Sequence, residues 1–181
     1  IKYIIYVIKE NRTYDQVFGN LPKGNGDPDL CIFGDDIAPN HRALAQQYVL
    51  FDNLYANGEV SVDGHHWSNG AFVPDSMQRT WPAQYGSKGA PPIRYGDFND
   101  PLSTNPSGRI WEMAAAKGLD YRTNYYHTTK KTNVAWNQAR GKGERDYVAM
   151  DIFLKDYAEF EASGKMPSLM VMALSEDHTK G

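Results

Sequence analysis

An apolar run near the start of the chain ends in polar residues whose side chains could bind a metal ion. Residues 4–8 are almost continuously apolar, and Glu10 and Asn11 follow after Lys9. Such a run predicts a parallel strand that is covered on both faces. Ligands bind at the carboxyl ends of strands in open α/β sheets, so Glu10 and Asn11 lie where a ligand-binding site is expected. Their oxygens suit a hard divalent cation, although capping the next helix and turning the chain would explain them equally well.

Ser61 is the candidate nucleophile. It follows an expected strand over residues 49–55 and precedes residues 64–73, which could open a helix. A helix N-terminus at this point would favour an anionic phosphate, and an activated serine can attack phosphorus. From the residues alone, an ordinary N-cap serine is the favoured alternative.

Three ionisable side chains follow Ser61 closely. His65 and His66 are adjacent, so on a helix they diverge and cannot easily hold one ion together. His65 is the better candidate for contacting a phosphate or protonating a leaving group, because histidine titrates near neutral pH. A packing or surface role beside Trp67 is the alternative. Asp63 could bind a metal or cap the helix, and the sequence leaves both open.

Asp177 and His178 follow an expected buried strand over residues 168–174, just as the first polar pair follows the first strand. Both are residue types that bind metals or phosphate. If they belong to the same site as Ser61 and the first polar pair, the side chains should converge at the carboxyl ends of three strands.

Residues 10–19, Glu-Asn-Arg-Thr-Tyr-Asp-Gln-Val-Phe-Gly, resemble a known opening motif. It is that of the phosphoesterase family of bacterial non-haemolytic phospholipases C and related acid phosphatases, within the alkaline-phosphatase-like superfamily. Residues 61–65 resemble the family segment in which a Ser or Thr is followed three and four residues later by Asn and by a basic residue or His. Gly64 stands here in place of the Asn. Residues 177–181 resemble the family segment Asp-His-Thr-x-Gly.

The resemblance implies a metal-dependent phosphoesterase that hydrolyses a phosphate mono- or diester through a serine nucleophile and a phosphoserine intermediate. It also implies an extracytoplasmic location. The implied cofactor is a divalent metal ion, Mg, Mn, Ca or Zn, and the competing hypothesis is a catalytically inactive secreted or cell-surface module that retains the fold. The implied metal ligands are Glu10, Asn11, Ser61, Asp177 and His178, with Asp63 and His65 at the substrate. Nothing here matches the acidic Asp pair that family members supply later in their chains, so we expect the metal site to be incomplete.

Composition narrows the possible partners. The chain has 181 residues and a formal net charge of −3, with positive and negative residues mixed. This charge pattern is not typical of a nucleic-acid-binding surface. No apolar run approaches the length of a membrane span. The single cysteine, Cys31, cannot form an internal disulfide.

Alternation of strands and helices predicts an α/β fold, with an alkaline-phosphatase-like, mostly parallel sheet flanked by helices. We expect one domain over residues 1–181, forming the N-terminal part of a longer protein. Turn-forming residues predict that 21–29 hold no regular element, and 74–106 should form a long ordered excursion over the active face. The remaining expected elements are helices over 39–48, 107–118 (with Ser107 as N-cap) and 146–162, and a strand over 119–122.

Overall fold

The computed structural model describes residues 1–84, 102, 104–126, 129–174 and 176. The chain divides into two compact units. The first combines residues 1–9 with residues 57–181, and the second comprises residues 10–56. No helix in the described ranges has both the length and the apolar character needed to cross a membrane.

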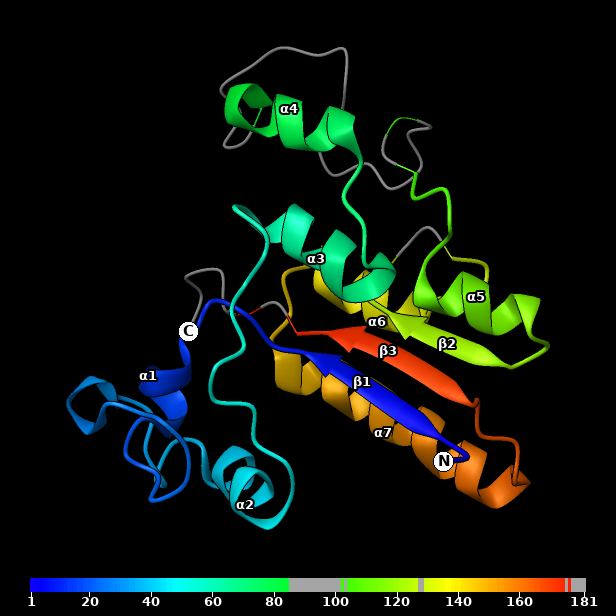
Figure 1. Cartoon of the computed structure of the whole chain (residues 1–181). Coiled ribbons are helices and arrows are strands. Elements are labelled where there is room, and N and C mark those ends of the chain that lie inside the picture. The colour runs from blue at the N-terminus through cyan, green and yellow to red at the C-terminus, as the bar shows by residue number, and fades with distance from the viewer. Residues whose placement is uncertain (85–101, 103, 127–128, 175, 177–181) are drawn as a thin grey trace. The chain divides into compact units, whose positions relative to one another are not determined.

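Three parallel strands form one sheet in the described part of the first unit, in the order β1-β3-β2 (Figure 1). The central strand, β3 (Leu169–Ala173), pairs with β1 (Ile4–Ile8) on one side and with β2 (Tyr121–Asn124) on the other. Leu169 is in register with both Ile4 and Tyr121. A parallel sheet flanked by helices confirms the α/β class predicted from the sequence.

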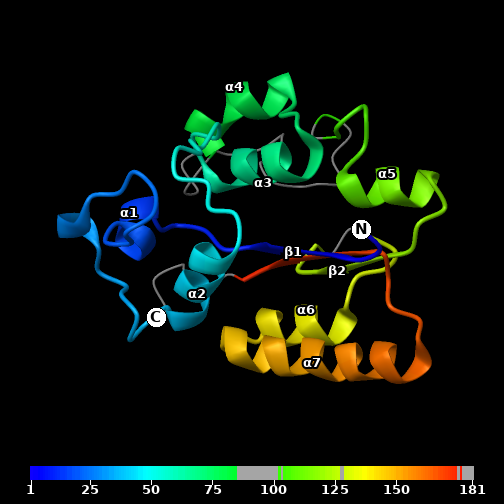
Figure 2. The ribbon, with the colours of Figure 1, turned by 60° about the horizontal axis from the view of Figure 1, so that its bottom comes forward.

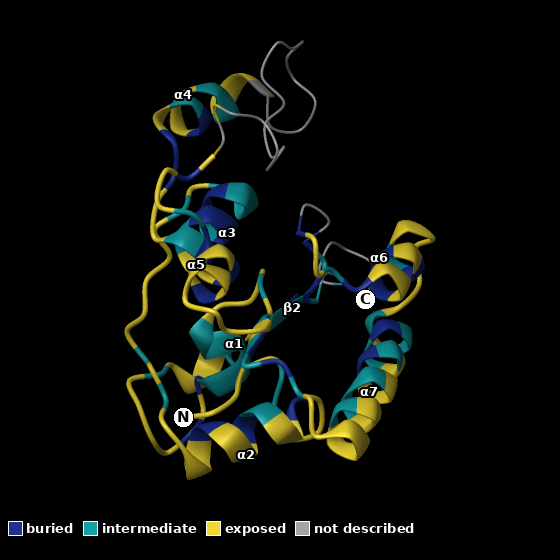
Figure 3. Ribbon diagram, turned by 90° about the vertical axis from the view of Figure 1, so that its right-hand side faces the viewer, coloured by how far each residue is buried: buried dark blue, intermediate teal, exposed yellow. Residues whose placement is uncertain are grey.

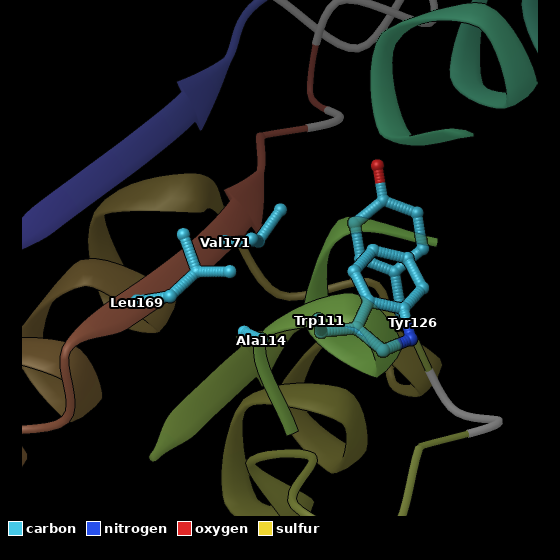
Figure 4. Close-up of a cluster of buried hydrophobic side chains, with 5 residues drawn as sticks. All are labelled: Trp111, Ala114, Tyr126, Leu169 and Val171. Carbon is cyan, nitrogen blue, oxygen red and sulfur yellow. The ribbon is translucent and has the colours of Figure 1, made fainter. Parts of the chain in front are cut away.

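The first face of β3 carries one half of the core. Leu169 and Val171 pack against Trp111 and Ala114 of α5 (Ile110–Ala116) and against Tyr126, which follows β2 (Figure 4). Because successive side chains of a strand point to opposite faces, the residues between them must be covered from the other side.

That second cover comes from α6 (Val134–Gly141) and α7 (Asp146–Ser163). Met170 and Met172 pack with Trp136 of α6 and with Phe153 of α7. Figure 2 shows α6 and α7 on one side of the sheet and α5 on the other. All five residues of β3 are buried, as the apolar run at residues 168–174 predicts.

The expected burial of β1 is wrong, although the strand itself is confirmed as parallel. Ile4, Ile5 and Val7 remain 48%, 43% and 43% exposed. Within the described sheet β1 has a neighbour only on the β3 side, and both buried apolar clusters centre on β3. A continuous apolar run therefore marks a strand here without indicating how deeply it is buried.

Helix α7 confirms the prediction for residues 146–162 and ends at Gly164, whose φ of 65° is favourable for glycine. The helix expected over 107–118 is present as α5, but its N-cap is Arg109 and not Ser107. The Arg109 amide donates to Glu112 Oε2 at 2.6 Å, whereas the Ser107 amide donates to Asn105 Oδ1 in the preceding turn. The strand expected over 119–122 lies slightly later, as β2.

The second unit contains α1 (Tyr14–Phe18), the 3-10 helix η1 (Pro28–Leu30) and α2 (Pro39–Gln47). Helix α2 confirms the prediction for residues 39–48, whereas η1 corrects the expectation that 21–29 hold no regular element. The strand expected over 49–55 is wrong. That segment is irregular, and its apolar side chains are exposed except for the half-buried Leu50. It lacks a pairing partner among the described residues, so β propensity alone does not make it a strand.

Two helices follow in the first unit, α3 (Ser61–Gly70) and α4 (Asp75–Gln84). Helix α4 lies within the predicted excursion over residues 74–106, so that stretch begins with a regular element. Residues 85–101 and 103 lie outside the described residues.

The two-sided burial of β3 predicts how one substitution acts at two positions. Val171→Ala, at 1% exposure, should lower the free energy of unfolding by about 2 kcal/mol through lost burial and a cavity. Val7→Ala, at 43% exposure on β1, should cost less than about 1 kcal/mol. Urea unfolding followed by circular dichroism measures both values. Equal losses would contradict the central position of β3.

Candidate active site around helix α3

Helix α3 buries polar side chains where a helix of a small domain usually buries apolar ones. Asp63, His65, His66 and Asn69 are only 3%, 6%, 2% and 2% exposed. Figure 3 shows dark blue, buried segments along α3. Burying polar groups is unfavourable unless they are hydrogen-bonded or paired, so the partners of this face define the chemistry available.

Ser61 is the first residue of α3, and the preceding Val60 is the N-cap. The helix therefore begins three residues earlier than the expected 64–73, and Ser61 is not an N-cap serine. The first intrahelical bond runs from the Gly64 amide to the Val60 carbonyl at 3.2 Å. The amides of the first turn thus lie at a helix N-terminus, where a negative charge is favoured, and Asp63 stands in that turn.

Both ends of α3 are fixed by close contacts. A Cβ added at Gly58 would lie 2.6 Å from the Gly64 amide nitrogen, so the incoming chain passes directly against the first turn. At the other end, Asn105 Nδ2 donates to the Gly70 carbonyl at 2.7 Å. The position of α3, and with it that of Ser61, therefore depends on contacts at each end.

A strained turn after β2 brings two tyrosines to α3. Tyr125 has φ 103°, which is rare for a residue with a side chain and often accompanies functional sites. Its amide donates to Asn137 Oδ1 at 3.1 Å, and its ring stacks on His65 with centroids 5.8 Å apart. The Arg140 guanidinium lies over the same ring at 5.1 Å. These contacts hold the turn in its unusual conformation.

Tyr126, His65 and Asn69 form a buried hydrogen-bonded group. The Tyr126 hydroxyl lies 3.0 Å from His65 Nδ1 and accepts from Asn69 Nδ2 at 2.8 Å. The same Asn69 nitrogen donates to the His65 carbonyl at 2.9 Å. His65 is therefore held at its ring and its backbone by residues of α3 and of the turn after β2.

His66 is buried within the electrostatic influence of Arg109. Burial, then Arg109 and then His65, lowers its pKa from the ordinary 6.5 to about 4, so His66 is neutral at pH 7. Arg109 is itself buried, and burial lowers the pKa of its guanidinium while Glu112 and Tyr126 oppose that shift. Arg109 also forms an ion pair with Glu112, with 3.7 Å between Nη1 and Oε1, so its charge is partly compensated within this part of the unit.

The segment that contains Asp177 and His178 lies outside the described residues, but the residue before it is described. The Glu176 amide donates to Asp146 Oδ2, and the Asp146 amide donates to Glu176 Oε2, both at 3.0 Å. Glu176 also pairs with Arg145. The chain leaving β3 is thus fastened to the N-terminus of α7 immediately before the two predicted ligands.

Glu10 and Asn11 belong to the second unit and begin it. Asn11 has φ 60°, a left-handed conformation that asparagine tolerates well, so it turns the chain as one alternative predicted. The N-cap of α1 is Thr13, which forms a capping box with Gln16. Capping therefore explains neither Glu10 nor Asn11.

In the described part of the chain, no group of three or more His, Cys, Asp or Glu side chains lies close enough to hold a metal ion. The convergence of Ser61, Asp177 and the first polar pair at one site stays a prediction. Of the predicted residues, α3 brings together Ser61, Asp63 and His65 on one element.

Sequence reasoning missed Asn69, Arg109 and Tyr126. Asn69 had a detectable signal, because it lies four residues after His65 and such residues share a helix face. Arg109 and Tyr126 had none, because they reach α3 only through the tertiary fold.

Two glycines near Ser61 should respond oppositely to the same substitution. Gly58→Ala forces a Cβ against backbone atoms and should destabilise the chain by roughly 1–3 kcal/mol. Gly64→Ala meets no atom within 4 Å and removes backbone freedom from the unfolded chain, so it should stabilise by about 0.5–1 kcal/mol. Unfolding in urea measures both. A destabilising Gly64→Ala would contradict the placement of Gly64 inside α3.

His66 should make stability depend on pH. Its folded pKa of about 4 lies below the ordinary 6.5, so as pH falls from 6.5 towards 4 the unfolded chain binds a proton that the folded chain does not. The free energy of unfolding contributed by His66 is therefore lost in this window. Urea midpoints between pH 7 and pH 4.5 should fall more steeply for the natural chain than for His66→Gln, and parallel profiles would contradict a buried neutral His66.

Comparisons with protein-family models, with curated proteins and with solved structures find no match for this chain. A functional assignment must therefore come from the residues of the site and from its geometry.

Proposed function

We propose that this chain is part of a metal-dependent phosphoesterase in which Ser61 attacks the phosphorus of a phosphate mono- or diester. Two resemblances support the assignment, that of residues 10–19 and that of residues 61–65 to segments of the phospholipase C and acid phosphatase family. The observation that carries it is the position of Ser61 as the first residue of α3, on the same helix as the buried Asp63 and His65.

The first turn of α3 suits a phosphate group. Its amides lack intrahelical acceptors and lie at the positive end of the helix dipole, so they favour an anion beside Ser61. Buried Arg109, which is paired with Glu112, acts electrostatically on the neutral His66 of the same helix. His65, on the next turn after Ser61, is the residue that contacts the phosphate or protonates the leaving oxygen.

Glu10, Asn11, Ser61, Asp177 and His178 are the proposed metal ligands. The first two fit the role chemically, since both supply hard oxygen donors. A bound divalent cation would neutralise phosphoryl oxygens and lower the pKa of the serine hydroxyl. Oxygen donors from these residues favour Mg, Mn or Ca, and the histidine is also compatible with Zn.

The reaction has two steps. The Ser61 hydroxyl gives its proton to solvent and its oxygen forms a bond to phosphorus while the bond from phosphorus to the departing alcohol breaks, and His65 gives a proton to that alcohol oxygen. Water then attacks the phosphoserine and passes one proton back to His65, while the bond from phosphorus to the Ser61 oxygen breaks. Phosphate or a monoester is released, and the Ser61 oxygen regains a proton from solvent. The proposed reaction is the same for a lipid headgroup, a nucleotide or a simple monoester as the substrate.

The proposal predicts that Ser61→Ala lowers the rate of hydrolysis of a chromogenic phosphate mono- or diester, in the presence of Mg or Mn, by on the order of 10³-fold or more. Chelation of the metal should abolish the same activity. The matched control is Ser68→Ala, at an exposed residue of the same helix. It removes a hydroxyl that donates to the His65 carbonyl at 3.3 Å, a contact that leaves the His65 ring untouched, and should leave the rate unchanged.

Activity that survives Ser61→Ala would exclude Ser61 as the nucleophile. Binding of inorganic phosphate without hydrolysis of either ester would instead favour the inactive module that retains the fold.

A further inference from the structure

Arg140 of α6 contacts two parts of the first unit that come from different elements. Its guanidinium carbon lies 5.1 Å from the centre of the Tyr125 ring, and its Nη1 lies 3.6 Å from Asp146 Oδ1. Tyr125 follows β2, whereas Asp146 is the first residue of α7. The side chains of Arg140 and Asp146 are only 22% and 20% exposed, so solvent screens this ion pair less than one on the open surface.

Two residues of α6 hold Tyr125 together. Asn137 Oδ1 accepts a hydrogen bond from the Tyr125 amide at 3.1 Å, while the Arg140 guanidinium lies over the Tyr125 ring. Asn137 and Arg140 are three residues apart on α6, so they share one face of that helix. One of them fixes the backbone at φ 103° and the other contacts the ring. Helix α6 therefore sets where the ring of Tyr125 lies.

The ring of Tyr125 is in turn the stacking partner of His65. The two ring planes are inclined by 20°, and their centroids are 5.8 Å apart. A stacked neighbour restricts the rotation of the imidazole because the two flat faces pack against each other. A displacement of the Tyr125 ring therefore changes the orientation of the His65 ring.

Asp146, at the other end of the Arg140 contact, is held by the chain that leaves β3. Asp146 Oδ2 accepts from the Glu176 amide, and the Asp146 amide donates to Glu176 Oε2, both at 3.0 Å. Glu176 also pairs with Arg145. The carboxylate that faces Arg140 is thus fixed by two reciprocal hydrogen bonds that involve the backbone of both residues.

We propose that Arg140 is a positioning residue that sets the orientation of His65 through the ring of Tyr125. The contacts run from Glu176 through Asp146 to Arg140, and from Arg140 through Tyr125 to His65. The inference rests on the proposed function for its catalytic consequence, because His65 is the proposed acid of that reaction. Arginine suits the role, since its planar charged group can pair with a carboxylate and also lie over an aromatic ring.

An Arg140 side chain that served stability alone would leave the His65 ring unmoved when its charge is removed. The test is therefore the aromatic proton NMR spectrum of the whole chain at neutral pH, with His65 assigned by comparison with His65→Gln. In the natural chain we expect nuclear Overhauser contacts between the His65 and Tyr125 rings. A natural chain without these contacts would overturn the proposal, whatever the stability of any variant.

Arg140→Met keeps the aliphatic part of the side chain and removes the charge. It should shift the His65 ring signals and weaken the contacts between the His65 and Tyr125 rings. The matched control is Lys142→Met, which removes an exposed positive charge at the C-cap of the same helix and should leave the His65 signals unchanged. His65 signals identical in Arg140→Met and in the natural chain would contradict the proposed role.

Arg140→Lys separates the charge from the loss of the side chain. Its ammonium can still pair with Asp146 and lie over the Tyr125 ring, so the His65 signals should return most of the way to those of the natural chain. An Arg140→Lys spectrum that matches that of Arg140→Met would show that the positive charge is not what holds the Tyr125 ring.

The route through Tyr125 has its own test. In a chain that already carries Tyr125→Leu, adding Arg140→Met should cause no further shift of the His65 signals, because the intervening ring is gone. The same shift in both backgrounds would overturn the route through Tyr125.

Kinetics add a separate readout. Arg140→Met should lower kcat for the phosphate ester about tenfold with little change in KM, since it disturbs the orientation of an acid and not a contact with substrate. Arg140→Lys should restore most of that loss. An unchanged kcat, with the His65 ring displaced, would overturn the part of the inference that links His65 to the reaction. If the natural chain hydrolyses no ester, the proposed function fails, while the NMR spectra still decide the role of Arg140.

Discussion

The burial of β3 on both faces is the constraint on which the first unit depends. Its side chains alternate between the cluster with Trp111 and the cluster with Trp136, so full burial of the strand requires the helices from both sides. The same strand fixes β1 and β2 in register. The cluster on the first face has a second consequence, because it includes Tyr126. The ring that completes the apolar core thus carries the hydroxyl that contacts α3, and the packing of the core sets the position of His65.

Only some features of helix α3 can be predicted from the sequence. The helix N-terminus near Ser61 is predictable from the residue types, and so is the shared face of His65 and Asn69, once 3.6 residues per turn are applied. The partners of that face are not. Tyr126 is 61 residues from His65 along the chain, and no local pattern connects the two. The hydrogen-bond geometry that gives the site its chemistry is therefore a product of the tertiary fold.

Other misses have equally specific causes. Residues 49–55 have strong β propensity, yet a strand needs a neighbour, and β propensity largely measures how side chains pack in a sheet. The apolar run at residues 4–8 predicts the strand β1 but not its exposure, because a run of apolar residues does not indicate whether helices cover both faces. The N-cap of α5 is Arg109 and not Ser107, because the Glu112 carboxylate accepts a hydrogen bond from the Arg109 amide. By contrast, β3 and α7 were predictable since each has a long periodic or apolar pattern and, for α7, a terminal glycine.

The polar face of α3 is itself an argument for function. Substituting apolar side chains at the positions of Asp63, His65 and His66 would bury area without the desolvation of ionisable groups, so stability alone does not favour the natural residues. Proteins keep such departures from the apolar pattern mainly where a site requires them. Here three buried ionisable side chains, Asp63, His65 and His66, fall within four residues of a helix that begins at the candidate nucleophile. Two residues of that helix, His65 and Asn69, are hydrogen-bonded to Tyr126 in the turn after β2. The ionisable side chains of α3 that are unfavourable to bury are thus also the ones that could take part in the proposed reaction. A helix with only a structural role would not need them.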